Sequence, residues 1–349
     1  MAVAGGCPFP TTRARTDGNG RRPACRRGGH APSELGLGRA CGRVRWHVGG
    51  CFRIGPFGGI GGAFGFVRCR LSVAETWRLI IEPQPRRASV NMAMDEALAE
   101  SVASGCAPPT LRLYRWSPAA VSIGRFQSVA DLDLERLDVR GLDWVRRLSG
   151  GRALLHGNEL TYALLLPLAH PVAQLGILDS YRALAGSLRA ALAALGVNAD
   201  PLKARARRMA AASAACLEQV SSWELAVAGR KLVGSAQCRR HGYVLQHGSL
   251  PLDGDPAALA EVLCLDTGGR ERLQDNLRAT ATTLAREMDM PGVEGELPDW
   301  QPLARAFACG FGNHAQVDWA EDGSQPAELE AAARLARVRY AAGAWLNLR

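Results

Sequence analysis

The stretch ELAVAGRKLVGSAQ, residues 224–237, decides the fold that the sequence predicts. Apolar and small residues predominate in both of its ends, 224–227 and 231–237, and Ala228-Gly229 between them is typical of a hairpin turn. A further strand-like run follows at residues 243–250. We therefore expect a hairpin and a third strand in this part of the chain.

Upstream of this hairpin, strand-like runs and helical patterns follow one another. Met94, Leu98 and Val102 recur every four residues and predict one helix, and a second apolar stripe predicts another at 181–195. From residue 255 onward the pattern is mostly helical. The strand-like runs are 77–81, 111–116, 120–123, 143–147 and 160–166. Clustered strands with helices between and after them favour an α+β sheet over a regular βαβ repeat.

The basic character of the chain is confined to its N-terminal part. Lys and Arg total 42 against 33 Asp and Glu, but residues 1–76 hold 12 of the basic side chains and only three acidic ones. Residues 77–349 therefore carry 30 of each and are neutral, so the net charge of +9 does not indicate nucleic-acid binding. No stretch approaches the ~20 consecutive apolar residues of a membrane span, which argues against a membrane protein.

Residues 1–76 do not have the pattern of a folded domain, because they hold 17 of the 39 glycines and little in them repeats. Three interpretations are open. An Arg-rich, acid-poor N-terminus is typical of an organelle transit peptide, although serines are few here. A zinc site is the second, with unusual spacings between Cys25, His30, Cys41, His47 and Cys51. The third is a disordered extension, translated upstream of the true start site.

Lysine and cysteine are used sparingly. Only two of the 42 basic residues are lysines, Lys203 and Lys231, and an ammonium can lose its proton in catalysis where a guanidinium cannot. The ten cysteines divide equally between residues 1–76 and the body, where no two are close enough for a CxxC motif. This spread does not indicate a disulfide framework, and it predicts a reducing compartment, the cytoplasm.

Three short segments carry residues suited to chemistry. In RRLSGGR, residues 146–152, adjacent glycines let a backbone approach a ligand and the arginines suit an anionic one. The small residues 234–236 leave room for a ligand beside Lys231. Cys216 has small neighbours and falls on an expected loop. Taken singly, each has an ordinary structural explanation: a turn, a strand end and a small buried thiol.

Together and in this order, the segments resemble the family of biotin and lipoate protein ligases and octanoyltransferases. The resemblance covers about residues 77–349 and is carried by NMAMDE at 91–96, LRLYRWSP at 111–118, SIGRFQ at 122–127, RRLSGGR at 146–152 with His156, ELTY at 159–162, GRKLVGSA at 229–236 and QHGS at 246–249. It implies a catalytic domain at 77–254, with a mixed, largely antiparallel sheet flanked by helices. It also implies a helical C-terminal segment, 255–349, packed on that domain.

The position of the cysteine distinguishes activities within this family. ATP-dependent ligases activate free lipoate and use no catalytic cysteine, whereas octanoyltransferases place one either after or before the shared lysine. Cys216 lies 15 residues before Lys231, which resembles the second group of octanoyltransferases. Cys238, seven residues after Lys231, is interpreted as an ordinary strand cysteine. The resemblance then implies an acyltransferase of lipoate biosynthesis.

The same resemblance assigns roles to individual residues. Cys216 is the expected nucleophile, which carries octanoyl as a thioester, and Lys231 is its cationic neighbour. Substrate contacts are expected from Arg147, Ser149, Gly150, Gly151, His156, Gly234, Ser235, Ala236, His247 and Gly248. No metal and no cofactor are expected. The implied partners are octanoyl-acyl-carrier protein as donor and the glycine-cleavage H protein or a dehydrogenase lipoyl domain as acceptor, with the enzyme a cytoplasmic monomer.

Other functions remain open at this stage. An ATP-dependent lipoate-protein ligase would not need Cys216, and a non-catalytic binding protein of the same fold would have an unreactive thiol there. An octanoyl amidotransferase acting between lipoyl carrier proteins also has an upstream cysteine. A separate basic cluster is interpreted either as a steering surface for acidic carrier proteins or as a solvated loop, and it consists of Lys203, Arg205, Arg207 and Arg208.

Overall fold

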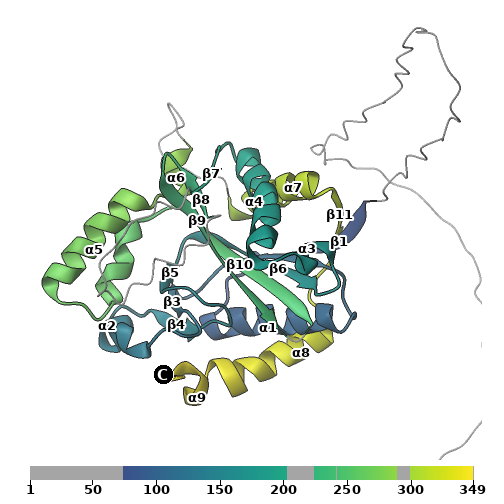
Figure 1. Cartoon of the computed structure of the whole chain (residues 1–349). Helices are drawn as coiled ribbons and strands as arrows, with labels where there is room; N and C mark the ends of the chain where they lie inside the picture. Colours follow the sequence, from purple (N-terminus) through teal and green to yellow (C-terminus); the bar gives the residue numbers. More distant parts are fainter. Residues whose placement is uncertain (1–73, 203–223, 241, 289–298, 349) are drawn as a thin grey trace, which may run out of the picture. The chain divides into compact units, whose positions relative to one another are not determined.

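The computed structural model describes residues 74–202, 224–240, 242–288 and 299–348, and this part of the chain is organised around an eight-stranded sheet (Figure 1). Its strands are β1 (Glu75–Ile81), β2 (Thr110–Tyr114), β6 (Glu159–Pro167), β7 (Asp200–Pro201), β8 (Leu225–Val227), β9 (Arg230–Arg240), β10 (Tyr243–Pro251) and β11 (Val317–Glu321). They lie in the order β11-β1-β2-β6-β10-β9-β8-β7. β1 is parallel to both neighbours and the remaining pairs are antiparallel, so the predicted mixed, largely antiparallel sheet is confirmed.

The hairpin expected at 224–237 is formed by β8 and β9. Ala228 and Gly229 connect the two strands with positive φ angles of 48° and 79°. Two consecutive residues in this left-handed region match the twist of a tight hairpin, which explains a glycine at the second position. β9 then pairs with β10 from Arg240 opposite Tyr243 to Gly234 opposite Ser249. The predicted hairpin and third strand are therefore both present.

β6 lies at the centre of the sheet and is buried on both faces. Leu160, Tyr162, Leu164 and Leu166 contribute to one hydrophobic cluster, and Ala163 and Leu165 contribute to another. This division follows from the period of two along a strand, which sends alternate side chains to opposite faces. A nine-residue strand that is largely apolar on both faces needs other elements to cover each face and exclude water from it.

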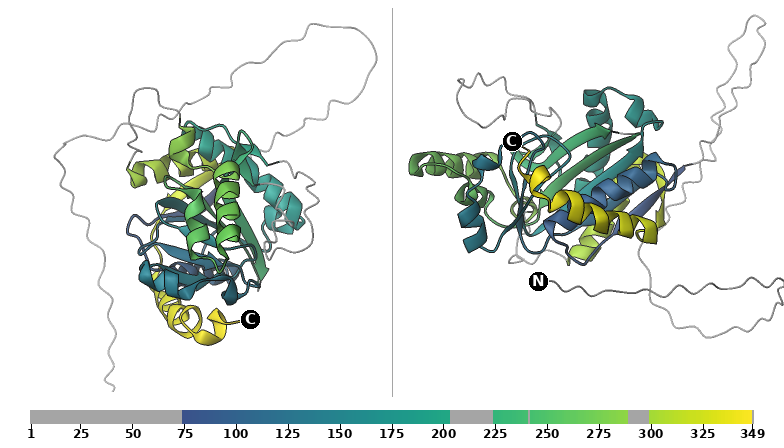
Figure 2. Two further views of the ribbon diagram at one scale, coloured as in Figure 1. Left: turned by 90° about the vertical axis from the view of Figure 1, so that its left-hand side faces the viewer. Right: turned by 90° about the horizontal axis from the view of Figure 1, so that it is seen from below.

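Four helices provide that cover (Figure 2). α4 (Ile177–Ala194) and α7 (Trp300–Ala315) pack together on one face, where the backbone of Ala190 leaves no room for a Cβ on Gly310. α1 (Ala88–Ala103) and α8 (Pro326–Leu335) lie side by side on the other face. A buried ion pair of 2.8 Å between Arg78 Nη2 and Glu328 Oε1 links α8 to β1.

A three-stranded sheet beside the large one carries the glycine-containing loop. Its strands are β3 (Ala120–Ile123), β4 (Asp143–Arg146) and β5 (Leu154–His156), in the order β4-β3-β5. The small hydrophobic cluster at this sheet includes Ile123, Leu137 and Val262. The remaining elements are α2 (Leu134–Val139), α3 (Pro171–Gln174), α5 (Thr267–Thr280), α6 (Leu284–Glu287) and α9 (Gly343–Leu346), 3₁₀ helices at Val129–Asp131 and Pro256–Val262, and a π-helical turn at Ala336–Tyr340.

β11 is the element that the mostly helical pattern after residue 255 does not predict. It follows α7 directly and pairs in parallel with β1, with Trp319 opposite Trp77. Val317 and Trp319 alternate with exposed residues, but a run of five residues is too short to stand out from the helical pattern on either side of it. Within the described residues, none of the helices is long and apolar enough to cross a membrane.

Candidate active site

Lys231 lies near the start of β9, where the hairpin is irregular. Its Nζ is 2.6 Å from Glu224 Oε1, and its side chain is 36% exposed. The pairing of β8 with β9 shifts at this point, so that Leu232 is an extra residue in β9. Strict alternation would place residues 231 and 234 on opposite faces. The bulge brings the Lys231 side chain over Gly234, where an added Cβ would lie 3.4 Å from Nζ.

Ser149 and His247 connect the loop of the small sheet to β10. Ser149 Oγ is 2.6 Å from His247 Nε2, and His247 Nδ1 is 3.2 Å from Asp95 Oδ2 on α1. All three residues are buried. His247 is opposite Ala236 on β9, so its side chain shares the face of Gly234 and Lys231. Two of the predicted contacts, Ser149 and His247, are thus in direct contact with each other.

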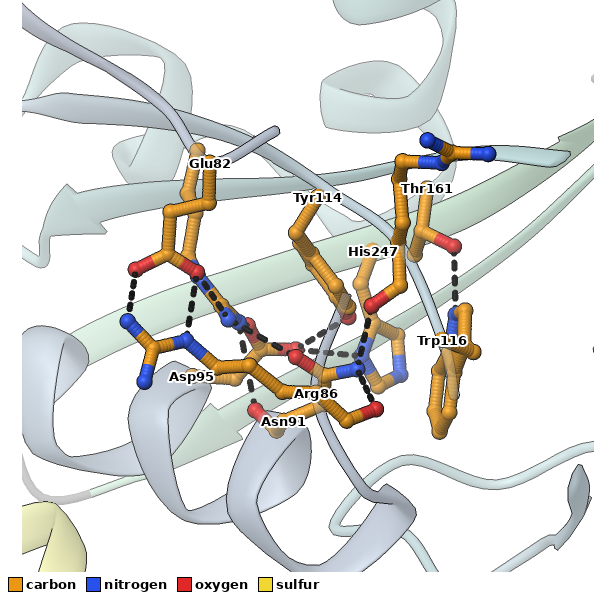
Figure 3. Close-up of polar contacts among 10 residues, drawn as sticks. Glu82, Arg86, Asn91, Asp95, Tyr114, Trp116, Thr161 and His247 are labelled. Atoms are coloured by element: carbon orange, nitrogen blue, oxygen red, sulfur yellow. Dashed lines mark hydrogen bonds and ion pairs between the residues drawn. The ribbon is translucent and has the colours of Figure 1, made fainter. Parts of the chain in front are cut away.

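Asp95 is held by a buried polar network centred on Arg112 of β2 (Figure 3). Arg112 Nη1 is 2.6 Å from Asp95 Oδ1, and Nη2 is 2.7 Å from Glu82 Oε2. Arg112 also donates to the backbone and side-chain oxygens of Asn91, and Tyr114 donates to Asp95 Oδ2 at 3.0 Å. Burial lowers the pKa of a guanidinium, but attraction by Glu82 and Asp95 outweighs it and raises the pKa of Arg112. These donors hold the Asp95 carboxylate in one orientation.

His156 belongs to a second buried network. Its Nδ1 is 2.8 Å from Glu159 Oε1, its Nε2 is 2.7 Å from Ser122 Oγ, and its ring stacks on Trp116 with centroids 3.9 Å apart. Thr161 donates to Glu159 and accepts a 2.7 Å hydrogen bond from the Trp116 indole. Both ring nitrogens of this predicted substrate contact therefore bond to protein groups.

Arg147 builds the loop on which the glycines lie. A guanidinium has five N–H donors, and Arg147 uses them on Ser122 O, Ser122 Oγ, Arg152 O and, twice, Gly150 O at 2.7–3.2 Å. In the described part of the chain it has no carboxylate partner, and burial lowers its pKa to about 10. The structure therefore places Arg147 as a support of the loop, with no donor left over for the anionic ligand that the sequence pattern suggests.

The two adjacent glycines have different roles in this loop. Gly151 has a φ of +93°, which favours glycine. Its carbonyl oxygen lies against Gly124, where an added Cβ would collide with it. Gly150 has nothing within 4 Å of the position that a Cβ would take. Gly151 is thus required by the backbone, whereas the space beside Gly150 is open to a ligand.

The C-terminal helix α9 packs against the same loop through Arg146. Arg146 Nη2 donates to Leu346 O at 2.8 Å, and the Trp345 indole donates to Arg146 O at 2.9 Å. Burial lowers the pKa of Arg146. α9 therefore supports the loop, although the two lie about 200 positions apart in the sequence.

The predicted small residues of β9 and β10 divide between two faces. Ser235 Oγ is 2.6 Å from Tyr162 OH, on the face covered by α4 and α7. Gly248 is opposite both of these residues, and an added Cβ there would lie 2.5 Å from the Tyr162 ring. Gly248 is thus explained by packing. Gly234 and Ala236 lie on the other face, with Lys231.

Ser249 is a buried hydroxyl in the QHGS segment and is not among the substrate contacts expected from the sequence. The residue is 2% exposed, and its Oγ has no hydrogen-bond partner among the described residues. It is opposite Gly234 and two residues from His247, so it shares their face. An unpaired buried hydroxyl costs about 1–3 kcal/mol, which makes Ser249 a candidate contact for a polar group of a substrate.

Asp95 is a second residue that the predicted contacts do not include. The available indication was a charged side chain at the end of NMAMDE, in a helix whose other residues are largely apolar. α1 is covered by the sheet on one side and by α8 on the other, so an acidic residue there must have buried partners. Only the tertiary structure identifies those partners as Arg112, Tyr114 and His247.

Cys216, the predicted nucleophile, lies outside the described residues. The described chain resumes at Glu224, which contacts Lys231. The predicted basic cluster of Lys203, Arg205, Arg207 and Arg208 also lies outside them. Of residues 1–76, for which three interpretations are open, residues 1–73 lie outside the described part as well. Their roles stay predictions.

Cys238 offers a test of thiol reactivity on β9. Burial raises its pKa to about 11. Because the thiolate is the reactive form, we expect iodoacetamide at neutral pH to alkylate Cys238 about 100-fold more slowly than an ordinary thiol, with the rate rising as pH approaches 11. Peptide mass spectrometry would follow it, with the exposed Cys106 and Cys264 as internal controls. Equal rates at all three positions would contradict the expectation.

Comparisons with known proteins extend over most of the described chain. The family of the lipoyl protein ligase A/B catalytic domain matches residues 87–306. An octanoyltransferase LipM of Brevibacillus brevis is 35% identical over 282 residues, covering 79% of this chain and 99% of the relative. An octanoyltransferase LipM of Kyrpidia tusciae is 39% identical over 279 residues, covering 78% and 98%.

Solved structures share the fold. A bipartite lipoate protein ligase of Thermoplasma acidophilum matches with a TM-score of 0.63 at 22% identity, over 78% of this chain and 96% of that one. A lipoate-protein ligase A bound with ATP matches with a TM-score of 0.61 at 22% identity, over 77% and 98%. The family match, the identity to full-length relatives and the shared fold agree with the motifs around Gly151 and Lys231. The chain belongs to the family of the lipoyl protein ligase A/B catalytic domain.

Proposed function

We propose that this protein is an octanoyltransferase of lipoate biosynthesis, which moves octanoyl from octanoyl-acyl-carrier protein through a Cys216 thioester to the lysine of a lipoyl carrier protein. The observation that carries the proposal is the identity of 33–39% to relatives named octanoyltransferase LipM. The order of Cys216 before Lys231 supports it, because one group of octanoyltransferases has this order. The lipoate ligases among the solved structures share only about 22% identity and support the fold alone.

In the first half-reaction, the Cys216 thiolate attacks the carbonyl carbon of the carrier thioester, the C–S bond to the carrier breaks, and the carrier leaves as a thiolate. Only a few per cent of an ordinary cysteine is thiolate at neutral pH, and a nearby cation increases that fraction. Lys231 is the candidate cation. Its contact with Glu224 holds the ammonium over Gly234, on the face of His247 and Ser249.

Each tetrahedral intermediate needs hydrogen-bond donors for its oxyanion. The backbone N–H groups of Gly234, Ser235 and Ala236 are candidates, but this stretch of β9 is paired with β10, which uses every second N–H. The unpaired Ser249 hydroxyl is a further candidate donor on the same face. Loss of one such donor typically slows catalysis by ~100-fold or more.

The octanoyl chain requires an apolar slot. Burial of eight carbons at ~0.8 kcal/mol per CH₂ provides at most ~6 kcal/mol, which is enough to favour octanoyl over short acyl groups. The residue with room for a chain is Gly150, which has open space at its Cβ position. The small residues Gly234 and Ala236 on β9 are the other candidate walls, with the Lys231 side chain lying over Gly234.

The partners follow from the same proposal. The donor is octanoyl-acyl-carrier protein, and the acceptor is the glycine-cleavage H protein or a dehydrogenase lipoyl domain, with the enzyme acting as a cytoplasmic monomer. The thioester supplies the energy for amide formation, so the scheme uses neither ATP nor a metal.

The proposal is tested with wild-type protein, octanoyl-acyl-carrier protein and intact-mass spectrometry, without ATP. We expect an octanoyl adduct that hydroxylamine removes, followed by octanoylation of a lipoyl domain when one is added. The ligase alternative predicts no adduct and requires ATP for transfer from free octanoate or lipoate. Absence of the adduct, or transfer only in the presence of ATP, would exclude the proposed function.

A further inference from the structure

The contacts among Asp95, His247 and Ser149 have a fixed direction. Tyr114 and Arg112 both donate to the Asp95 carboxylate, which is held as an acceptor. In the neutral imidazole, His247 Nδ1 therefore carries the proton in its contact with Asp95, and Nε2 is left as an acceptor. The Ser149 hydroxyl then donates to Nε2 across 2.6 Å.

In this direction, the Ser149 proton is used in the hydrogen bond to His247, and the lone pairs of Ser149 Oγ are left to accept a hydrogen bond. In the described part of the chain, no other group makes a side-chain hydrogen bond to Ser149 Oγ. It is a hydroxyl that can accept a hydrogen bond from a ligand and pass its own proton to an imidazole. Such a group suits a ligand that must lose a proton, such as an attacking amine.

Ser122, His156 and Glu159 provide an internal comparison. They repeat the order of hydroxyl, imidazole and carboxylate, with Ser122 Oγ 2.7 Å from His156 Nε2 and Nδ1 2.8 Å from Glu159. Here, however, Arg147 Nη1 donates to Ser122 Oγ at 3.0 Å. The Ser122 hydroxyl is thus already occupied as an acceptor, and this array only supports the loop.

We infer that Ser149, His247 and Asp95 form the proton-accepting unit for the acceptor lysine, an inference that rests on the proposed octanoyl transfer. Ser149 is the catalytic residue, because it would contact the attacking nitrogen. His247 and Asp95 are positioning residues, which act through Ser149.

The lysine nitrogen attacks the carbonyl carbon of the Cys216 thioester, a C–N bond forms, and the C–S bond breaks with its electron pair on sulfur. The nitrogen loses one proton to Ser149 Oγ as the Ser149 proton moves to His247 Nε2. Asp95 stabilises the imidazolium so formed. The proton then returns through Ser149 to the departing Cys216 thiolate, and the enzyme is regenerated.

The placement of these residues on the sheet suits this role. His247 and Ser249 are two residues apart on one face of β10, a separation of ~7 Å along a strand. Ser249 is opposite Gly234, over which the Lys231 side chain lies. A substrate carbonyl near the unpaired Ser249 hydroxyl would therefore have Lys231 on one side and the Ser149–His247 pair on the other.

The test separates the two half-reactions in His247→Gln and Ser149→Ala. Glutamine can donate to Asp95 and accept from Ser149, but it cannot take a proton. We expect both variants to form the octanoyl adduct within about threefold of the wild-type rate and to transfer it to a lipoyl domain about 100-fold more slowly, the usual size of a general-base effect. Hydroxylamine is a neutral nucleophile at neutral pH and needs no base to remove its proton. It should therefore remove the adduct from the variants and from the wild type alike.

Two further variants distinguish proton transfer from simple support of the fold. Ser149→Thr retains the hydroxyl and should restore transfer. His314→Gln is the matched control, because exposed His314 on α7 also contacts a serine, Ser187, at 3.1 Å but lies on the other face of the sheet. It should transfer at the wild-type rate. Circular dichroism would show that each variant is folded.

The possible outcomes are distinct. Wild-type transfer rates in His247→Gln would overturn the inference, as would an equal loss in both half-reactions, which indicates a structural role. An octanoyl ester on Ser149 in Cys216→Ala would overturn it as well, since Ser149 would then be a nucleophile. Absence of an adduct on wild-type protein would instead overturn the proposed function, and with it the inference.

Discussion

Cys216→Ala is expected to lose octanoyl transfer by at least about 1,000-fold, because no other group in the proposed mechanism can hold the acyl chain between donor and acceptor. The variant should also form no hydroxylamine-labile adduct with octanoyl-acyl-carrier protein. Intact-mass spectrometry measures both effects in one reaction. An adduct of unchanged yield on Cys216→Ala would show that another residue is the nucleophile.

Cys238→Ala is the matched control for this result, and Lys231→Arg is a second test of the same site. Cys238 lies after Lys231 on β9, and burial raises its pKa to about 11, so its removal should leave transfer within about twofold of wild type. Lys231→Arg keeps a positive charge near Gly234 but is bulkier and cannot give up its proton. Because the larger guanidinium cannot take the position of the ammonium against Glu224 and over Gly234, we expect it to slow adduct formation by ~100-fold, the effect of a misplaced charge-stabilising contact.

Arg112→Met is expected to lower the free energy of unfolding by about 3–5 kcal/mol, the usual cost of removing one partner from a buried ion pair. Arg112 is fully buried and contacts both Glu82 and Asp95. Methionine retains much of the side-chain volume but leaves these two carboxylates without their cation. Urea unfolding followed by circular dichroism measures the change.

Arg305→Met is the control for this prediction. Arg305 also forms an ion pair, with Glu321, but about half of each side chain is exposed. Solvent screens such a pair, so the change should be under about 1 kcal/mol. In the double variant Arg112→Met/Asp95→Asn, loss of the unpaired charge should make the total cost smaller than the sum of the single changes. Equal effects of Arg112→Met and Arg305→Met would contradict the central place of Arg112.

The predicted hairpin and the strand after it show what local sequence can establish. Ala228 and Gly229 occur between two apolar runs, and the turn depends on the conformations of these two residues alone. The helix at Ile177–Ala194 follows in the same way from its apolar stripe. Such elements are decided by neighbours in the chain, so their positions could be predicted before their packing was known.

β11 and the Lys231 bulge show where local sequence is insufficient. β11 pairs with β1, which lies more than 200 residues earlier in the chain. The residues around β11 do not indicate this pairing. The bulge at Leu232 reverses the face on which Lys231 lies, which a strict period of two would have predicted wrongly. Both features depend on which strands meet, and that is settled by packing of the whole sheet.

The candidate site likewise has features that the sequence predicts and features that it does not. The segments that contain Ser149, Lys231 and His247 were identified from the sequence, because each has an unusual composition and their order resembles one family. The sequence did not predict that Arg147 and His156 would have their polar atoms bonded within the protein. A residue's type shows what it can bind, whereas its neighbours in space decide what it does bind.

By itself, the sequence determined the α+β class, the family and the order of Cys216 before Lys231, since these are recorded in local patterns and motifs. Only the tertiary structure decided that Asp95 contacts His247 and that His247 contacts Ser149. These three residues come from α1, β10 and the loop after β4, and they meet because the large sheet and the small sheet pack on the same helix. A hydrogen bond has a direction only when both partners are in place.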